Sequence, residues 1–184
     1  MPTWLWIVIV VVAVIVVIAV VASALRTKRS RALQERFGPE YDRVAADAPS
    51  RRDAESELRE RQKRREELDI RPLDQSDRDR YRNRWQEVQA EFVDEPADAV
   101  VHADALIQEV MRVRGYPVED FDTRSADLSV DHPDVVEYYR AAHGIAVAHE
   151  RGSAGTEELR HAVQHYRRLF DELVGEHDSE MVSR

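Results

Sequence analysis

The chain has 184 residues, of which 34% are charged and 43% hydrophobic, with a formal net charge of −9 and no cysteine. This length accommodates one membrane segment and one small domain, and the charge content excludes a polytopic membrane protein. Because cysteine is absent, disulfides, thiolate catalysis and cysteine zinc sites are also excluded.

The first predicted element is an uncharged apolar run from Trp4 to Leu25. As a helix rising about 1.5 Å per residue it would extend roughly 33 Å, enough to cross a hydrocarbon core of about 30 Å. Trp4 and Trp6 suit the headgroup boundary at one end of such a span. We therefore expect a transmembrane helix over residues 4–25.

A cleaved signal peptide is the alternative, because Ala22, Ser23 and Ala24 form an A-x-A-like cleavage site. Two features favour an uncleaved anchor. No Lys or Arg precedes the run, and the run is longer than the usual h-region of about 7–15 residues. Under the alternative, the helical protein would be exported and released after Ala24.

Basic residues follow the run directly, whereas no charged side chain precedes it. These flanking residues are Arg26, Lys28, Arg29 and Arg31. The positive-inside rule then predicts that the C-terminal domain of this single-pass protein is cytoplasmic.

Charge is divided unevenly along the rest of the chain. Residues 26–65 carry 13 Lys and Arg against 8 acids, a net charge of +5, whereas residues 66–184 carry 14 against 28, a net charge of −14. An anionic leaflet would attract the basic part and repel the acidic part. The acidic domain also disfavours nucleic acid as a partner, because phosphates would be repelled.

Residues 26–69 are interpreted as a basic juxtamembrane segment and a charged helical spacer. A break is predicted at Gly38 and Pro39, and Ser50 with Asp53 resembles an N-cap. The helix from Ser50 to Leu68 holds i,i+4 pairs of Glu and Arg but few apolar residues, so a solvated spacer is favoured. Coiled-coil pairing and a helix lying on the membrane surface stay open.

Residues 70–175 are predicted to form a helical domain, followed by a frayed tail at 176–184. Four helices are expected: from Ser76 to about Val93, from Pro96 to Gly115, from Pro133 to Gly152, and from Thr156 to Gly175. Their apolar stripes are Tyr81, Trp85, Val88, Phe92; Val100, Ala103, Ile107, Val110; Val135, Tyr139, Ala142, Ala146; and Leu159, Val163, Tyr166, Phe170, Leu173. Strand-like alternation is nearly absent, so the fold class is all-α, with a roughly four-helix, bundle-like domain.

The stretch from Val113 to Asp122 interrupts the helical pattern. Gly115 as the C′ residue and Tyr116 beside Met111 fit a Schellman cap, and Pro117 prevents the helix from resuming. The connector 116–132 is longer than the usual helix–helix loop of about 2–8 residues. It either packs as a short helix or presents a surface for a protein partner; the candidate partner-binding residues are Tyr116, Glu119, Asp120, Phe121 and Asp122.

Several segments together resemble a family of uncharacterised bacterial single-pass membrane proteins. They are the N-terminal span, "ERFGPEYDR", "RPL", "RYRNRWQEVQAEFVDEP", "RGYP", "LSVDHP" and "TEELRHAVQHYRRLF". The resemblance implies a bacterial cell-membrane location. It supplies no activity and no catalytic residue, because the family has none assigned.

No catalytic, cofactor or metal site is predicted from the motifs. His161 and His165 have the i,i+4 spacing of metal ligands, but both fall away from the apolar stripe and lack further ligands. The arginines between Arg78 and Trp85 flank a core stripe and have acids nearby, so they are interpreted as surface arginines. Phosphate-loop, Rossmann and nucleophile-elbow patterns are absent.

The sequence therefore predicts a membrane-tethered helical domain that acts as an adaptor or assembly factor through a protein partner. A homo-oligomer stays open. The alternatives are a membrane-anchored enzyme or a metal-binding regulator, besides the exported form.

Overall fold

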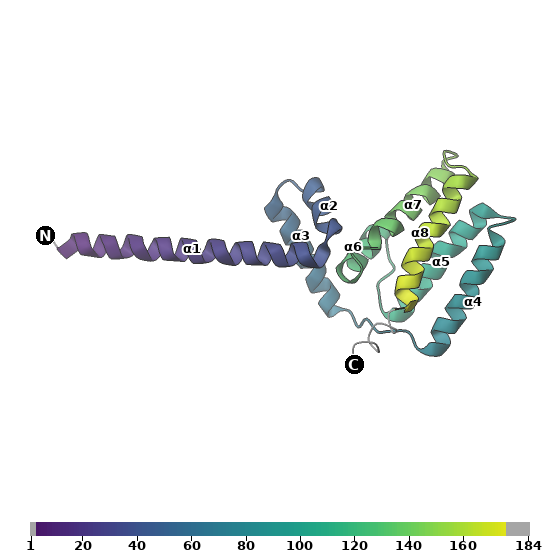
Figure 1. The fold of residues 1–184 in the computed structure, drawn as a ribbon, viewed down its shortest axis with the longest axis horizontal. Helices are drawn as coiled ribbons and strands as arrows, with labels where there is room; N and C mark the ends of the chain where they lie inside the picture. Colours follow the sequence, from purple (N-terminus) through teal and green to yellow (C-terminus); the bar gives the residue numbers. More distant parts are fainter. Residues whose placement is uncertain (1–2, 176–184) are drawn as a thin grey trace.

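The computed structural model describes residues 3–175, with the side chains at 3–11, 13 and 22 left out of the description. The described part of the chain forms eight helices and no strand, which confirms the all-α prediction. The molecule is elongated, with one long N-terminal helix extending away from the packed helices (Figure 1).

The long helix, α1, runs without interruption over Thr3–Phe37, and α2 follows over Pro39–Asp47. Gly38 between them has φ 47°, a left-handed conformation that favours glycine, and Pro39 occupies the first turn of α2. The predicted break at Gly38 and Pro39 is thus confirmed.

Among the described residues, no helix has both the length and the mean hydropathy of a membrane span, so the transmembrane helix expected over 4–25 is not supported here. The side chains of Trp4 and Trp6 lie outside the described set.

The third helix, α3 (Arg51–Glu67), packs against the end of α1, against α2 and against α6 (Phe121–Asp131). Ala54 and Leu58 of α3 are fully buried in this contact. We call this assembly the small core; its buried apolar members are Leu33, Phe37, Tyr41, Val44, Ala54, Leu58 and Val130. The interpretation of α3 as a solvated spacer is therefore corrected. Its two buried apolar side chains are enough to pack the helix, because three other helices enclose them.

The remaining helices form the bundle: α4 (Gln75–Glu91), α5 (Pro96–Arg114), α7 (Val136–Glu150) and α8 (Thr156–Gly175). Helix α8 packs along both α5 and α7, and α4 lies against α5 (Figure 1). The predicted apolar stripes lie inside, with Tyr81, Trp85, Tyr139, Tyr166 and Phe170 all at most 1% exposed. The four-helix arrangement is confirmed; the tail at 176–184 lies outside the described residues.

Helix starts agree with the sequence at Ser50, Pro96 and Thr156 but differ at Ser76 and at Pro133, since α7 begins only at Val136. Ser50 caps α3 by accepting a hydrogen bond from the Asp53 amide at 3.2 Å, as predicted. Helix α4 begins earlier than expected, because Asp74 rather than Ser76 caps it and accepts from the Asp77 amide at 2.7 Å. Both oxygens are common N-cap acceptors, and a carboxylate also suits the positive helix end.

The end of α5 is the predicted Schellman cap. The Tyr116 amide donates to the Met111 carbonyl at 2.9 Å and the Gly115 amide donates to the Arg112 carbonyl at 3.1 Å. Gly115 has φ 99°. A Cβ at this position would lie 2.3 Å from the backbone oxygen of Asp69, so glycine also lets the α3–α4 connection cross the end of α5.

Candidate functional site

The expected connector 116–132 contains a helix, α6, that lies between the small core and the bundle (Figure 1). The segment was predicted either to pack as a short helix or to present a surface, and the structure shows a short packed helix. Its buried side chains include Arg124, Ser125, Asp127 and Ser129, which are polar. They are buried because α6 is covered on both sides, by α3 and by α7.

Tyr116 is a correction to the predicted partner-binding set. It is only 3% exposed, and its hydroxyl donates to Asp131 Oδ2 at 2.7 Å. Burial and the nearby carboxylate raise the pKa of Tyr116, so the hydroxyl stays protonated as a donor. In this arrangement Tyr116 is a core residue and cannot anchor a partner.

Phe121 is half-buried at the start of α6. Its ring stacks on His143 with centroids 3.7 Å apart and lies 5.0 Å from the ring of Tyr139. Asp120 caps the helix by accepting from the Thr123 amide at 2.9 Å, and this hydrogen bond lowers the pKa of Asp120. Glu119 and Asp122 are exposed beside them. An acidic surface with one partly exposed aromatic ring therefore exists at this helix start.

A cavity of about 290 Å³ adjoins that surface, between α6, α7 and the α2–α3 pair. Its lining includes Arg43, Glu57, Arg61, Phe121, Asp122 and Arg140. The structure thus brings two of the predicted partner-binding residues, Phe121 and Asp122, next to three arginines that were not predicted from the sequence.

The arginines converge on one buried carboxylate, Glu40, which is 2% exposed. Arg43 donates to both Glu40 oxygens at 2.9 and 2.8 Å, and Arg140 does the same at 2.6 and 2.8 Å. Arg61 adds a bond at 2.7 Å. We call Glu40, Arg43, Arg61 and Arg140 the Glu40 cluster; it joins α2, α3 and α7, and therefore the small core and the bundle.

The electrostatics of the Glu40 cluster favour a permanently ionised carboxylate. Burial alone would raise the pKa of Glu40, but the hydrogen bonds from Arg43 and Arg140 outweigh it and lower the pKa to about 2. A carboxylate so fully engaged has no free oxygen to act as a catalytic base, so the arrangement indicates a structural joint.

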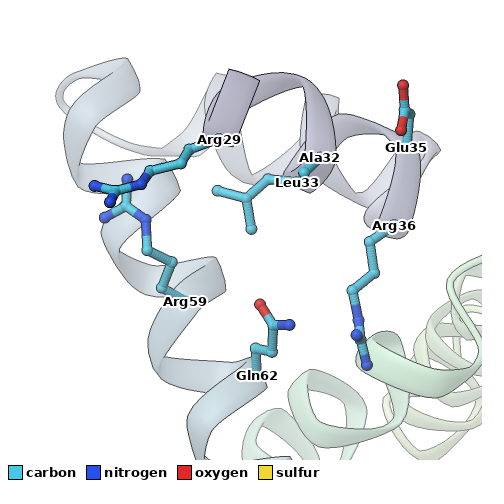
Figure 2. A pocket seen from close by; sticks show the side chains of 7 residues that line it. All are labelled: Arg29, Ala32, Leu33, Glu35, Arg36, Arg59 and Gln62. Carbon is cyan, nitrogen blue, oxygen red and sulfur yellow. The ribbon is translucent and has the colours of Figure 1, made fainter. Parts of the chain in front are cut away.

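A second and larger cavity, about 600 Å³, lies between α1 and α3. Figure 2 shows its lining residues: Arg29, Ala32, Leu33, Glu35 and Arg36 from α1, with Arg59 and Gln62 from α3. We call it the α1–α3 cavity. It is rich in guanidinium groups, and its Arg29 follows the apolar run of α1 by four residues.

The histidines considered as metal ligands occupy different environments. His161 is exposed, whereas His165 stacks on Tyr138 with centroids 5.5 Å apart, and burial lowers its pKa. His165 is thus packed between α7 and α8 rather than fully solvated, which corrects its assignment to a solvated face. Within the described residues, no group of three or more candidate ligands comes together.

The arginines that begin α4 pair with nearby acids. Arg80 lies 2.7 Å from Asp77, and Arg84 lies 2.6 Å from Glu109 of α5. The guanidinium of Arg80 also lies over the ring of Tyr81, at 4.8 Å from its centroid. Arg80 and Arg84 agree with the interpretation of surface arginines that cover a core, but Arg78 corrects it: Arg78 is buried and donates to the Leu73 carbonyl and to Gln75 Oε1.

Comparisons with protein-family models, with curated proteins and with solved structures find no match to the chain. The resemblance to a family of bacterial single-pass proteins therefore stays a prediction.

Proposed function

We propose that the protein is a membrane-tethered helical domain that binds another protein at the inner face of a bacterial cell membrane. One observation carries the tether. The described apolar side chains in the N-terminal half of α1 are exposed: Val12, Ile15, Val17 and Ile18 are 53%, 59%, 60% and 62% exposed. A long exposed apolar surface of this kind is unfavourable in water, and lipid would cover it.

Continuity of α1 supports the same proposal. The uncharged run from Trp4 to Leu25 and the bases from Arg26 to Arg31 belong to one unbroken helix. A helix satisfies its own backbone hydrogen bonds, which is the requirement for any element placed in hydrocarbon.

Extraction from native membranes tests the tether. The full chain should stay in the membrane pellet after an alkaline carbonate wash, and a variant with Ile15→Arg and Ile18→Arg should be released. The matched control is Val93→Arg, because Val93 is 80% exposed on the α4–α5 turn and should not affect retention. Release of the wild-type chain would reject the tether, and a product beginning after Ala24 would favour the exported form.

The proposed protein-binding surface is the acidic start of α6, formed by Glu119, Asp120, Phe121 and Asp122, without Tyr116. The exposed carboxylates favour a basic partner and a salt-sensitive association rate. Phe121 supplies an aromatic side chain, the kind that often dominates binding energy. A crosslinking pull-down from native membranes would identify the partner.

Phe121→Ala separates binding from packing, because both the melting temperature and recovery of the crosslinked partner are measured. Loss of the partner with an unchanged melt supports the surface. A large drop in melting temperature assigns Phe121 to the core, consistent with its stacking on His143. In that event Glu119→Gln with Asp122→Asn, which alters only exposed side chains, decides whether the acidic surface binds.

A further inference from the structure

We propose that the α1–α3 cavity binds the phosphate of an anionic phospholipid headgroup. The inference rests on the proposed membrane tether, and it specifies a ligand site that the tether alone does not require. Arg29 and Arg59 supply the recognition chemistry and Arg36 adds positive charge to the lining, because guanidinium groups bind phosphate oxygens through paired, charge-assisted hydrogen bonds.

The cavity has an excess of unpaired positive charge. Its lining contains Arg29, Arg36 and Arg59 against a single acid, Glu35. Among the described residues, Arg29 and Arg36 have no acidic group within ion-pair distance, and only Arg59 has one, Glu55 at 3.3 Å. In Figure 2, the guanidinium groups of Arg29 and Arg59 extend toward the same edge of the cavity, whereas Glu35 and Arg36 both point away from that edge. An anion between these groups would relieve their mutual repulsion.

Other exposed bases of the described part of α1 and α3, such as Arg31 and Arg52, also have no acidic partner, so the cavity is distinguished by bringing Arg29 and Arg59 together. Arg43, Arg51, Arg61, Arg64 and Arg65 of α2 and α3 all pair with acids. Acids are thus available throughout the small core, yet none is placed against Arg29 or Arg36. The ion pairs therefore leave positive charge on the α1 wall of the cavity, at Arg29 and Arg36.

The two walls of the cavity are held together by buried polar contacts. Ser30 of α1 donates to Glu55 Oε1 of α3 at 2.6 Å and accepts from Arg51 at 2.6 Å. Leu33 of α1, 6% exposed, packs in the small core on the other side. These contacts fix the spacing of the arginines before any ligand arrives, which lowers the ordering cost of binding.

The position along α1 selects a lipid as the source of the phosphate. Arg29 follows the last residue of the apolar run, Leu25, by one helical turn, about 6 Å along the axis. Headgroups extend roughly 5–8 Å beyond the hydrocarbon on each side of a bilayer. Arg29 therefore falls at headgroup depth, and the Arg59 side chain extends toward it in Figure 2. The exposed apolar side chain of Ala32 suits the glycerol and first methylenes of the lipid.

The test uses the full chain in a neutral detergent and titrates it with dihexanoyl phosphatidylglycerol. Native mass spectrometry counts bound lipid and gives an apparent Kd. We expect one tightly bound phosphatidylglycerol and on the order of tenfold weaker binding of dihexanoyl phosphatidylcholine, whose choline the arginines repel. Arg29→Gln, Arg36→Gln and Arg59→Gln combined should weaken phosphatidylglycerol binding by roughly tenfold or more.

A matched variant removes the same charge outside the cavity: Arg26→Gln, Lys28→Gln and Arg31→Gln combined. It should retain binding within about twofold if the arginines form a site. Equal loss in both triple variants would show diffuse electrostatic attraction and overturn the proposal, as would retention in both. Should the cavity triple variant unfold, Arg29→Gln alone serves, because Arg29 is exposed on α1 and has no ion pair among the described residues.

Two further measurements distinguish a lipid ligand from free phosphate, and the cavity site from the proposed tether. Inorganic phosphate that competes with the lipid at equal concentration would overturn the lipid assignment in favour of a free phosphate. The short-chain lipid needs no bilayer, so its binding is measured independently of the tether. If the chain resists carbonate extraction but does not bind the lipid, only the cavity site is rejected. Intact binding in a chain that carbonate releases rejects only the tether.

Discussion

At the scale of single residues, Glu40 has the most consequential environment in the molecule. One carboxylate with 2% exposure receives bonds from three arginines of three helices. A buried ion cluster contributes little net stability compared with apolar packing, but breaking it leaves charges uncompensated. We therefore expect it to specify how the small core and the bundle dock.

Replacing Glu40 with Gln should lower the free energy of unfolding by about 3–5 kcal/mol at pH 7, because Arg61 and Arg140 would lose their buried counterion. Urea denaturation measures this loss. Asp47→Asn is the control: Asp47 also pairs with Arg43, at 3.1 Å, but its side chain is 73% exposed and its loss should cost well under about 1 kcal/mol. Similar losses in both variants would argue against a special role for Glu40.

The same carboxylate predicts acid sensitivity. Its pKa is about 2 in the folded chain against an ordinary 4.5, so the folded state binds the proton less readily than the unfolded state. The stabilisation is fully present above pH 4.5 and is lost as the pH falls through about 2; it amounts to about 3 kcal/mol. The stability of Glu40→Gln should fall less than that of wild type over this window. Parallel pH profiles would contradict the assignment.

At the scale of helices, periodic apolar positions allowed the four bundle helices and the caps at Ser50 and Gly115 to be predicted. Helix α6 was not assigned from sequence, since its buried residues are largely polar and give no apolar stripe. The Glu40 cluster was also missed. Only its Arg43 contact is local, whereas Arg140 lies 100 residues from Glu40, and no sequence spacing encodes such a contact.

Leu58→Ala tests whether α3 is packed or a solvated spacer. Leu58 is fully buried in the small core, so its truncation should cost about 2–5 kcal/mol in the free energy of unfolding. Ser56→Ala, at an exposed position of the same helix, should change stability by less than about 0.5 kcal/mol. A Leu58 loss as small as the Ser56 change would restore the spacer interpretation.

Two glycines should respond in opposite directions to alanine. Gly115→Ala should destabilise by more than about 1–2 kcal/mol, since φ is 99° and the new Cβ would lie 2.3 Å from the Asp69 oxygen. Gly144 lies inside α7 with no atom within 4 Å of an added Cβ, so Gly144→Ala should stabilise by about 0.5–1 kcal/mol. Thermal melts of both variants give the comparison; stabilisation by Gly115→Ala would be inconsistent with the cap.

At the scale of the whole molecule, charge and shape are arranged along one axis. The apolar part of α1 is followed by unpaired bases, then by the small core, and the acidic bundle lies farthest away (Figure 1). A membrane with an anionic surface would favour this order, attracting the bases and repelling the bundle. The same asymmetry determines which side of the membrane the bundle would occupy.

We expect the bundle on the cytoplasmic side, because Arg26, Lys28, Arg29 and Arg31 follow the apolar run and no charge precedes it. The chain has no cysteine, so a single Ser153→Cys variant, at an exposed position between α7 and α8, reports location without background from this protein. In intact cells an impermeant thiol reagent should leave it unlabelled, whereas lysed cells should label fully. A variant with Arg26, Lys28, Arg29 and Arg31 changed to Gln should lose this bias. Labelling of the parent variant in intact cells, at the level of an external control, would reverse the proposed orientation while leaving the tether itself intact.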